Sequence, residues 1–338
     1  MASAVKQNLK IVAYVHKSFH NLLFPKIEAL SPYATIVNAG YDIENYNEEK
    51  LKDANVLVLH GHAGHAFEIL YSKMPKLQWV HSCSAGVDWL FNSGCGEDFK
   101  KNETQVLTNA KGCYSLSLAE YTIGAMLYFE KQFPRLQQQR KDRKWKGFIM
   151  NQLPGKTLGI VGYGDIGQQC AKLAKPFGLN IIGLRRSPEK SNGDPNITKC
   201  LPIDQLNQLI PLCDFIVVAC ALTDETVGLI GEEQLKLMKE SCVVINMARG
   251  PCIDEDKLID ALRDGKIKGA ALDVTTIEPL PKDSKLWDIP DDRLLLSPHI
   301  ADRTEDMTEN TLDLFVEKIK YYQKHVKHEF VVNKITMY

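Results

Sequence analysis

The chain has 338 residues, of which 44% are hydrophobic and 25% charged, as in a soluble globular protein with room for two domains. A formal net charge of −1 leaves no basic excess to neutralise phosphates, so no nucleic-acid partner is expected. No apolar run reaches the ~20 residues of a membrane-spanning helix, so no membrane partner is expected either.

The nine cysteines are scattered singly and form no C-x-x-C pair. Several lie in or beside apolar runs, which is typical of buried thiols in a reducing compartment and not of a disulfide framework or zinc site. The first ten residues lack the apolar core of a secretory signal, and the last three residues match no peroxisomal or ER-retention tripeptide. We expect a cytoplasmic protein without a metal site.

The first part of the chain alternates strand and helix patterns. Strands are expected at 9–15, 56–59, 77–82 and 105–108, and helices at 19–30 and 47–54. This alternation predicts a small parallel-sheet α/β domain. Because it has no glycine motif for phosphates, we expect it to supply the substrate side of a cleft.

A long helical pattern follows at 117–139, with apolar residues at three- and four-residue spacing and Pro134 expected to kink or end it. Strands are then expected at 158–161, 180–184, 215–220, 243–247, 269–274 and 294–297, with helices at 168–177, 204–209, 231–238 and 254–265 between them. These repeated units predict a doubly wound sheet of about six or more strands. A last amphipathic helix at 305–324 is expected to return to the first domain.

A glycine motif joins the first strand of this sheet to its helix. The motif comprises Gly162, Tyr163, Gly164, Asp165, Ile166 and Gly167. The first glycine allows the tight turn, the second lets a pyrophosphate approach the backbone, and the third lets the helix pack closely. Free N–H groups at the helix N-terminus favour phosphate binding, so the motif predicts a dinucleotide site; the alternative is a glycine-rich turn without a ligand.

The end of the second strand indicates which dinucleotide binds. NAD-binding domains place an acidic residue there for the ribose hydroxyls, but this strand ends in Arg185, Arg186 and Ser187. Two guanidinium groups and a hydroxyl would bind a 2′-phosphate that a carboxylate repels. NADP(H) is therefore the preferred cofactor, and NAD(H) remains possible if both arginines point into solvent.

Three polar residues follow apolar strands, where open α/β sheets bind their ligands: Arg249, Glu278 and His299. Reduction of a keto acid needs a cation for the carboxylate and carbonyl, and an acid of near-neutral pKa for the oxygen. A carboxylate beside the histidine would keep it protonated and oriented. Each residue alone also fits a structural role on a turn or loop.

An ordered set of segments resembles the D-isomer-specific 2-hydroxyacid dehydrogenase family, especially its glyoxylate/hydroxypyruvate reductases. The segments are 84–88, 108–112, 118–120, 153–167, 222–226, 246–250, 271–274, 278–281 and 297–299. The resemblance covers nearly the whole chain. Glu278 weighs against the formate dehydrogenase branch, which has Gln with its histidine.

The resemblance implies a role for each matched residue. His299 would be the general acid/base, Glu278 its partner, and Arg249 the group that binds the substrate carboxylate and carbonyl. The loop Ser84, Ala85 and Gly86 would hold the same carboxylate through backbone N–H groups. The remaining expected cofactor contacts are Leu222, Thr226, Ala248 and Asp273, with Asp273 on the nicotinamide carboxamide.

The implied fold is α/β with two Rossmann-like domains. One is a doubly wound parallel-sheet cofactor domain at 112–302, and the other is a smaller, flavodoxin-like substrate domain formed by 1–111 and 303–338. A homodimer is also expected, and Trp145 lies where some relatives place a tryptophan that reaches the partner's active site. Core packing would explain Trp145 equally well.

Some features stay open. Ala221 replaces a usual proline, which would loosen the cofactor-side loop, and Asp302 with Arg303 would either reshape the substrate pocket or form a surface ion pair. His60, His62 and His65 lie in one loop that would line the substrate pocket, lie on the surface or, least favoured, bind metal.

Together these features predict an NADPH-dependent reductase that converts small 2-keto acids, foremost glyoxylate and hydroxypyruvate, to D-2-hydroxy acids. One alternative is a dehydrogenase for a bulkier 2-hydroxy acid of the phenylpyruvate type. Another is a nucleotide-sensing, corepressor-like scaffold with weak turnover.

Overall fold

The computed structural model describes residues 8–61, 63–323 and 331–336. The chain divides into two compact units, which we describe separately: unit 1 comprises Met1–Cys113 and Thr304–Tyr338, and unit 2 comprises Tyr114–Arg303.

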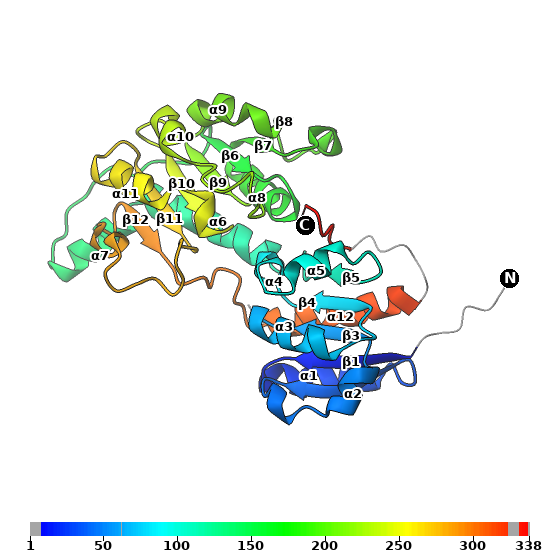
Figure 1. The fold of residues 1–338 in the computed structure, drawn as a ribbon. Helices are drawn as coiled ribbons and strands as arrows, with labels where there is room; N and C mark the ends of the chain where they lie inside the picture. Colours follow the sequence, from blue (N-terminus) through cyan, green and yellow to red (C-terminus); the bar gives the residue numbers. More distant parts are fainter. Residues whose placement is uncertain (1–7, 62, 324–330, 337–338) are drawn as a thin grey trace. The chain divides into compact units, whose positions relative to one another are not determined.

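Unit 1 is built on a five-stranded parallel sheet of order β2-β1-β3-β4-β5 (Figure 1). Its strands are β1 (Leu9–Tyr14), β2 (Ala34–Gly40), β3 (Val56–Leu59), β4 (Trp79–Ser82) and β5 (Val106–Thr108). Its helices are α1 (Lys17–Glu28), α2 (Glu48–Asp53), α3 (Gly64–Lys73), α4 (Asp88–Phe91), α5 (Gly96–Lys101) and α12 (Met307–Gln323). This strand order is that of flavodoxin-like domains.

Both faces of the sheet in unit 1 are covered. Apolar residues of α1 and α12, such as Leu23 and Phe315, form one buried cluster with the sheet, and those of α2 to α5, such as Phe67 and Phe99, form the other. The C-terminal helix therefore packs in the same unit as the N-terminal strands.

Unit 2 contains a seven-stranded parallel sheet of order β12-β11-β10-β9-β6-β7-β8. Its strands are β6 (Thr157–Val161), β7 (Asn180–Leu184), β8 (Lys199–Leu201), β9 (Phe215–Val218), β10 (Val243–Asn246), β11 (Gly269–Leu272) and β12 (Leu294–Leu296). Its helices are α6 (Ser115–Glu130), α7 (Phe133–Lys141), α8 (Asp165–Ala174), α9 (Leu206–Leu209), α10 (Glu232–Leu237) and α11 (Glu255–Arg263). The chain reverses direction across the sheet between β6 and β9, the switch point at which Rossmann sheets bind dinucleotides.

The central strands of unit 2 are apolar along their whole length because both faces are buried, as in β9 with its sequence FIVV. On one face they pack with α9, α10 and α11. On the other, α6 and α8 pack together, and Gly269 lies so close to the Phe129 ring of α6 that a Cβ would be 2.5 Å from it. The fold confirms the predicted α/β class with two Rossmann-like sheets.

Sequence patterns missed two edge strands and the helices α3, α4 and α5, whereas the expected break near Pro134 in the helical pattern at 117–139 is present. Edge strands β2 and β8 were not predicted, because edge strands are partly exposed and their residues are less apolar. The expected helix at 117–139 is two helices, and the break lies at Gln132, whose φ of 52° is left-handed. Pro134 lies in the first turn of α7, where its missing N–H costs nothing.

Candidate active site

The glycine loop between β6 and α8 is shaped by close backbone packing. Gly162 has φ of 99°, and a Cβ on it would lie 2.5 Å from the Cys220 backbone N. A Cβ on Gly167 would lie 2.5 Å from the Gly162 carbonyl oxygen. At Gly164, by contrast, a Cβ would meet nothing within 4 Å. Nothing in the protein demands glycine there, and the open space fits a pyrophosphate that approaches the backbone.

Not every residue of the motif faces this open space. The Tyr163 side chain is fully buried against Gly183, its hydroxyl donates to Asp194 Oδ2 at 2.8 Å, and its N–H donates to the Leu184 carbonyl at 2.8 Å. Tyr163 is thus an anchor between β6 and β7, and we leave it out of the proposed cofactor contacts.

The N-terminus of α8 remains available for a phosphate. The N–H groups of Asp165, Ile166 and Gly167 are in the first helical turn, where no intrahelical acceptor exists. The Asp165 carboxylate accepts a hydrogen bond from the Ser115 hydroxyl of α6, so its side chain is held by the protein.

The end of β7 carries two arginines with different surroundings. Arg185 is partly buried and donates from Nη1 to Ser191 Oγ at 2.9 Å. Arg186 is exposed, and its Nη2 lies 2.7 Å from Glu225 Oε2 in the loop after β9. The nearby carboxylate of Asp194 is occupied by Tyr163 and by Asn196. Of the described side chains here, the arginines and Ser187 are those that suit a 2′-phosphate.

The loop after β9 is closed by a threonine. Thr226 is buried; its hydroxyl donates to the Ala221 carbonyl at 2.8 Å and accepts from the Thr223 N–H at 2.7 Å. The loop is therefore held by side-chain contacts even though Ala221 replaces a usual proline. Leu222 packs against the apolar core of unit 2.

The ends of β11 and β12 bring His299 and Glu278 together. His299 Nδ1 lies 2.7 Å from Glu278 Oε2, and the Glu278 Oε1 atom accepts the Thr275 N–H at 3.1 Å. The bond to Glu278 raises the pKa of His299 above its ordinary value, although burial acts in the opposite direction. Burial alone would raise the pKa of Glu278, but its bonds to His299 and Thr275 hold that pKa below the usual range.

Arg249 follows β10 in a turn shaped by Asn246. The buried Asn246 side chain accepts the Ala248 N–H at 3.1 Å and donates to the Arg249 carbonyl at 3.0 Å. The Arg249 guanidinium donates to the Ala248 carbonyl at 2.8 Å, and its positive charge acts on both His299 and Glu278. Unit 2 thus holds an arginine, a histidine and a carboxylate bonded to that histidine at the carboxyl edge of one sheet.

Gly250 allows the Arg249 turn to lie directly against the chain after β11. A Cβ at this position would be 2.0 Å from the Thr275 carbonyl carbon. The close approach brings the Arg249 turn next to the segment that leads to Glu278.

Asp273 lies buried beneath the turn that carries His299. It is 2% exposed, and its two carboxylate oxygens accept hydrogen bonds from Ser297, Ile300 and Ala301 in the turn that carries His299. Its main observed contact is therefore with this turn.

In unit 1, the loop of Ser84, Ala85 and Gly86 follows β4. Its three carbonyls all accept hydrogen bonds from the protein: Ser84 from the Ala110 N–H, Ala85 from the Asn109 side chain at 2.6 Å, and Gly86 from the Trp89 indole at 3.1 Å. Within the described part of the chain, the N–H groups of Ala85 and Gly86 have no acceptor. This arrangement suits binding of a carboxylate.

The histidines of the 60–65 loop do not form a metal site in the described residues. His60 directly follows β3; its Nδ1 lies 2.9 Å from the Tyr41 hydroxyl, and its ring contacts the Phe19 ring at a tilt, with centroids 3.8 Å apart. His62 lies outside the described residues. Within residues 8–61, 63–323 and 331–336, no group of three or more His, Cys, Asp or Glu side chains is placed so that it could hold a metal ion.

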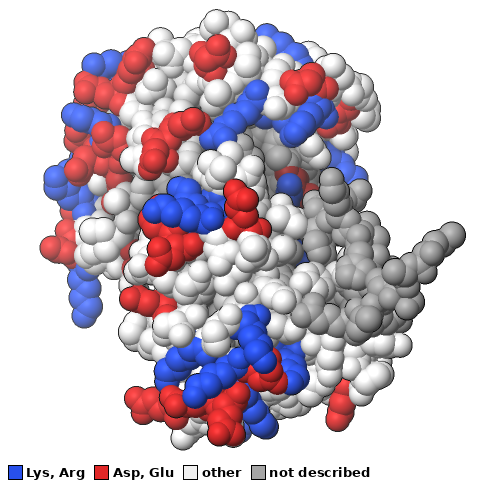
Figure 2. Space-filling model, turned by 45° about the vertical axis from the view of Figure 1, so that its right-hand side comes forward, with Lys and Arg blue, Asp and Glu red and all other residues white. Residues whose placement is uncertain are grey.

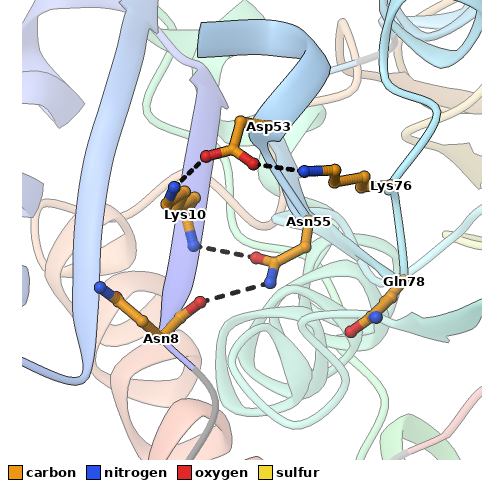
Figure 3. Close-up of a pocket in the computed structure, with 6 residues that line it drawn as sticks. All are labelled: Asn8, Lys10, Asp53, Asn55, Lys76 and Gln78. Atoms are coloured by element: carbon orange, nitrogen blue, oxygen red, sulfur yellow. Dashed lines mark hydrogen bonds and ion pairs between the residues drawn. The ribbon is translucent and has the colours of Figure 1, made fainter.

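A surface hollow in unit 1 lies at the opposite edge of its sheet, at the amino ends of β1, β3 and β4. Figure 3 shows Lys10 and Lys76 both directed at the Asp53 carboxylate, and the Asn55 side chain bonded to the backbone of Lys10 and Asn8. These polar groups satisfy one another. Ligands of open α/β sheets bind at the carboxyl edge, so the hollow is not the candidate site.

Surface charge and helix length are relevant to whether the protein binds a nucleic acid or a membrane. On the face drawn in Figure 2, basic and acidic side chains are intermixed. None of the helices in the described residues has both the length and the apolar character to cross a membrane.

Residues 123–301 match the family model for the NAD-binding domain of D-isomer specific 2-hydroxyacid dehydrogenases. The chain belongs to this family. The D-3-phosphoglycerate dehydrogenase of Methanocaldococcus jannaschii is 36% identical over 84% of this chain and 53% of that protein. The glyoxylate reductase of Pyrococcus furiosus is 32% identical over 85% of this chain and 84% of that one.

A solved structure of a D-isomer specific 2-hydroxyacid dehydrogenase family protein from Aeromonas salmonicida agrees with the fold. It is 27% identical, with a TM-score of 0.80 over 98% of this chain and 100% of that chain. The present chain spans about half the length of the phosphoglycerate dehydrogenase relative. The family and fold predicted from the motifs are thus confirmed.

Sequence reasoning missed several residues that shape the site. Tyr121 and Ser297 contact each other, Asn246 shapes the Arg249 turn, and Asn109 and Trp89 hold the 84–86 loop. Tyr121 lies on an apolar helical stripe, which gave no sign of a polar contact, whereas Asn109 belongs to a recognised family segment and was a detectable candidate.

Proposed function

We propose that this dehydrogenase reduces small 2-keto acids to D-2-hydroxy acids with NADPH, and that glyoxylate and hydroxypyruvate are its leading substrates. The observation that carries the proposal is the 2.7 Å contact between His299 Nδ1 and Glu278 Oε2. With Nδ1 bonded to Glu278, Nε2 would be the ring atom that gives a proton to a substrate oxygen.

The acid role follows from the electrostatics of the pair. Because Glu278 raises the pKa of His299, the imidazolium persists to higher pH than an isolated histidine would allow. His299 would then donate its Nε2 proton to the carbonyl oxygen as the bond to hydrogen forms at carbon. In the reverse direction the neutral ring would accept that proton.

Arg249 would bind the substrate carboxylate and polarise the carbonyl. Its guanidinium is permanently charged and presents several donors, which suits a carboxylate next to a carbonyl. The N–H groups of Ala85 and Gly86 in unit 1 are proposed to bind a substrate carboxylate. Hydrogen bonds from Arg249 and from these N–H groups would orient the keto acid.

NADP(H) is the proposed cofactor, which when bound supplies the hydride. The open space at Gly164 fits its pyrophosphate, and the first turn of α8 offers N–H donors. Arg185, Arg186 and Ser187 would bind the 2′-phosphate, whereas no carboxylate at the end of β7 is available for the ribose of NAD. Leu222, Thr226 and Ala248 are proposed to line the same side of the cleft.

The D-3-phosphoglycerate dehydrogenase relative supports a second candidate reaction, oxidation of D-3-phosphoglycerate with NAD. A panel separates the candidates: glyoxylate, hydroxypyruvate and phenylpyruvate are each assayed with NADPH and NADH, and D-3-phosphoglycerate with NAD and NADP. We expect the highest kcat/KM for a small keto acid with NADPH. Preference for phenylpyruvate or D-3-phosphoglycerate would replace the substrate assignment, and no turnover at all would favour the corepressor-like scaffold.

We further propose that a second copy of the chain covers an exposed arm in unit 2, residues 142–152. The Trp145 side chain is fully exposed and Ile149 is 88% exposed, although the arm is anchored by Asn151, whose N–H donates to the Glu130 carbonyl at 3.1 Å. Solvent-exposed apolar side chains on an anchored segment are typical of an interface. Sedimentation analysis should show a dimer that Ile149→Asp weakens; a wild-type monomer at micromolar concentration would refute this.

A reducing compartment such as the cytoplasm is proposed as the location, because all nine cysteines are free thiols. Thiol titration of the unfolded protein without prior reduction should count nine thiols. A lower count after rapid alkylation in cells would contradict this location.

A further inference from the structure

The turn that carries His299 has a backbone that must be held from outside. His299 has φ of 53°, a left-handed conformation that a residue with a Cβ rarely adopts. The turn follows β12, and a relaxed backbone there would carry the imidazole away from Glu278. What holds the turn therefore decides where the imidazole lies.

Asp273 supplies the inner part of this support. The His299 N–H donates to the Asp273 carbonyl at 2.8 Å, while the N–H groups of Ile300 and Ala301 donate to the Asp273 carboxylate at 3.0 and 3.1 Å. The Ser297 hydroxyl lies 2.7 Å from the same carboxylate. Every residue from 299 to 301 is thus bonded to one buried aspartate.

Helix α6 extends the support outward. The Tyr121 hydroxyl lies 2.9 Å from Ser297 Oγ, and Ser117 Oγ donates to the Ala301 carbonyl. A carboxylate only accepts, so the single proton of Ser297 goes to Asp273, and Ser297 must accept from Tyr121. Burial raises the pKa of Tyr121 to about 12, which keeps its hydroxyl a donor throughout the neutral range.

We propose that Tyr121 and Ser297 are positioning residues for the reaction. Their directed hydrogen-bond chain, Tyr121 to Ser297 to Asp273, fixes the His299 turn so that the imidazole stays on Glu278. The inference rests on the proposed function, because it gives the chain the task of orienting the proton donor. Bonds in such a chain polarise one another, so loss of the outer hydroxyl weakens the inner contact as well.

The charged groups that face His299 are Glu278, Arg249, Asp273 and Asp302. Glu278 makes the largest contribution and acts through a direct hydrogen bond that depends on distance and angle. Displacement of the turn therefore weakens this contribution first, and the pKa of His299 falls. The pH dependence of the reaction reports this displacement, whereas a loss of stability alone does not change it.

The test compares Tyr121→Phe and Ser297→Ala with two matched controls. Tyr128→Phe removes a hydroxyl on the same helix that donates to the Asp291 carbonyl at 2.8 Å, outside the chain. Ser297→Thr keeps the hydroxyl and should restore much of what Ser297→Ala loses. For each variant, kcat and KM for glyoxylate with NADPH are measured across pH, together with the NMR titration of the His299 ring, assigned with His299→Gln.

We expect kcat to fall about tenfold in Tyr121→Phe and Ser297→Ala with KM nearly unchanged, since a small misplacement of a catalytic group has effects of this size. The high-pH limit of activity and the His299 titration should both move to lower pH, and Tyr128→Phe should match the wild type. An unchanged His299 titration in Tyr121→Phe, or an equal loss in Tyr128→Phe, would overturn the proposal.

The ring titration needs no substrate. A wild type that reduces no keto acid would remove the proposed function, whereas a wild type that turns over while Tyr121→Phe leaves the titration unchanged would remove this inference alone.

Discussion

Glu130 at the end of α6 is a buried charge whose removal should destabilise unit 2. Its side chain is 0% exposed and lies 2.6 Å from both Lys156 and Lys268, which are 24% and 25% exposed. These lysines directly precede β6 and β11. The carboxylate thus ties one helix to the starts of two strands, and Glu130→Gln removes its charge at nearly constant volume.

The magnitude follows from the burial. Breaking a buried ion pair by removal of one partner costs about 3–5 kcal/mol. Because both lysines reach water and the amide keeps one acceptor oxygen, we take the lower end, about 3 kcal/mol. In a unit of this size each kcal/mol lowers Tm by about 2–4 °C, so Tm should fall by about 6–12 °C.

Differential scanning calorimetry at pH 7 measures this effect. Glu225→Gln is the matched control, because it removes an equally charged partner from an ion pair whose carboxylate is 74% exposed, and exposed pairs contribute little. Its Tm should stay within about 1 °C of the wild type. A Glu130→Gln variant as stable as this control would refute the reasoning.

Three further predictions concern the proposed active site. Glu278→Gln removes the hydrogen bond that contributes most to raising the pKa of His299. Because keto-acid reduction needs the protonated ring, the high-pH limit of the reaction should move to lower pH. An unchanged pH profile would exclude Glu278 as the partner of His299. Glu225→Gln removes a negative charge beside Arg186 that would repel a 2′-phosphate, and it should lower KM for NADPH severalfold without changing KM for NADH. Steady-state kinetics with both cofactors would contradict this if both constants changed equally. Gly164→Ala should fold with wild-type Tm, because its Cβ meets nothing within 4 Å, yet should weaken dinucleotide binding in calorimetric titration; wild-type affinity would argue against a phosphate at this loop.

The local features of the fold were predictable because they depend on neighbouring residues. Apolar runs such as FIVV at β9 predict buried parallel strands, and a glycine motif between a strand and a helix predicts the turn at Gly162. Edge strand β2, with sequence ATIVNAG, escaped prediction because its apolar run is short, is interrupted by Asn38 and is only partly buried. A break near Pro134 was predicted, but its place at Gln132 was not, because a left-handed residue other than glycine leaves no sequence pattern.

Side-chain contacts between distant segments were not predictable in the same way. Ser297 lies 176 residues from Tyr121, and Glu130 lies 138 residues from Lys268, so their contacts exist only once the sheet has formed. The motif residues Arg249, Glu278 and His299 were recognisable by type and position. The sequence did not show, however, whether a given side chain faces the site or the core. Tyr163 shows the difference, since it lies inside the glycine motif and yet packs in the core.

The central claim is that His299 acts as the proton donor in reduction of a small 2-keto acid. The most direct measurement is kcat for glyoxylate with NADPH in the wild type and in His299→Ala, with calorimetric titration of NADPH to show that the variant still binds cofactor. We predict that the wild type turns over and that kcat of the variant falls by about 10²–10⁴-fold, the usual contribution of general acid catalysis. A His299→Ala variant that binds NADPH and keeps the wild-type kcat would contradict the account.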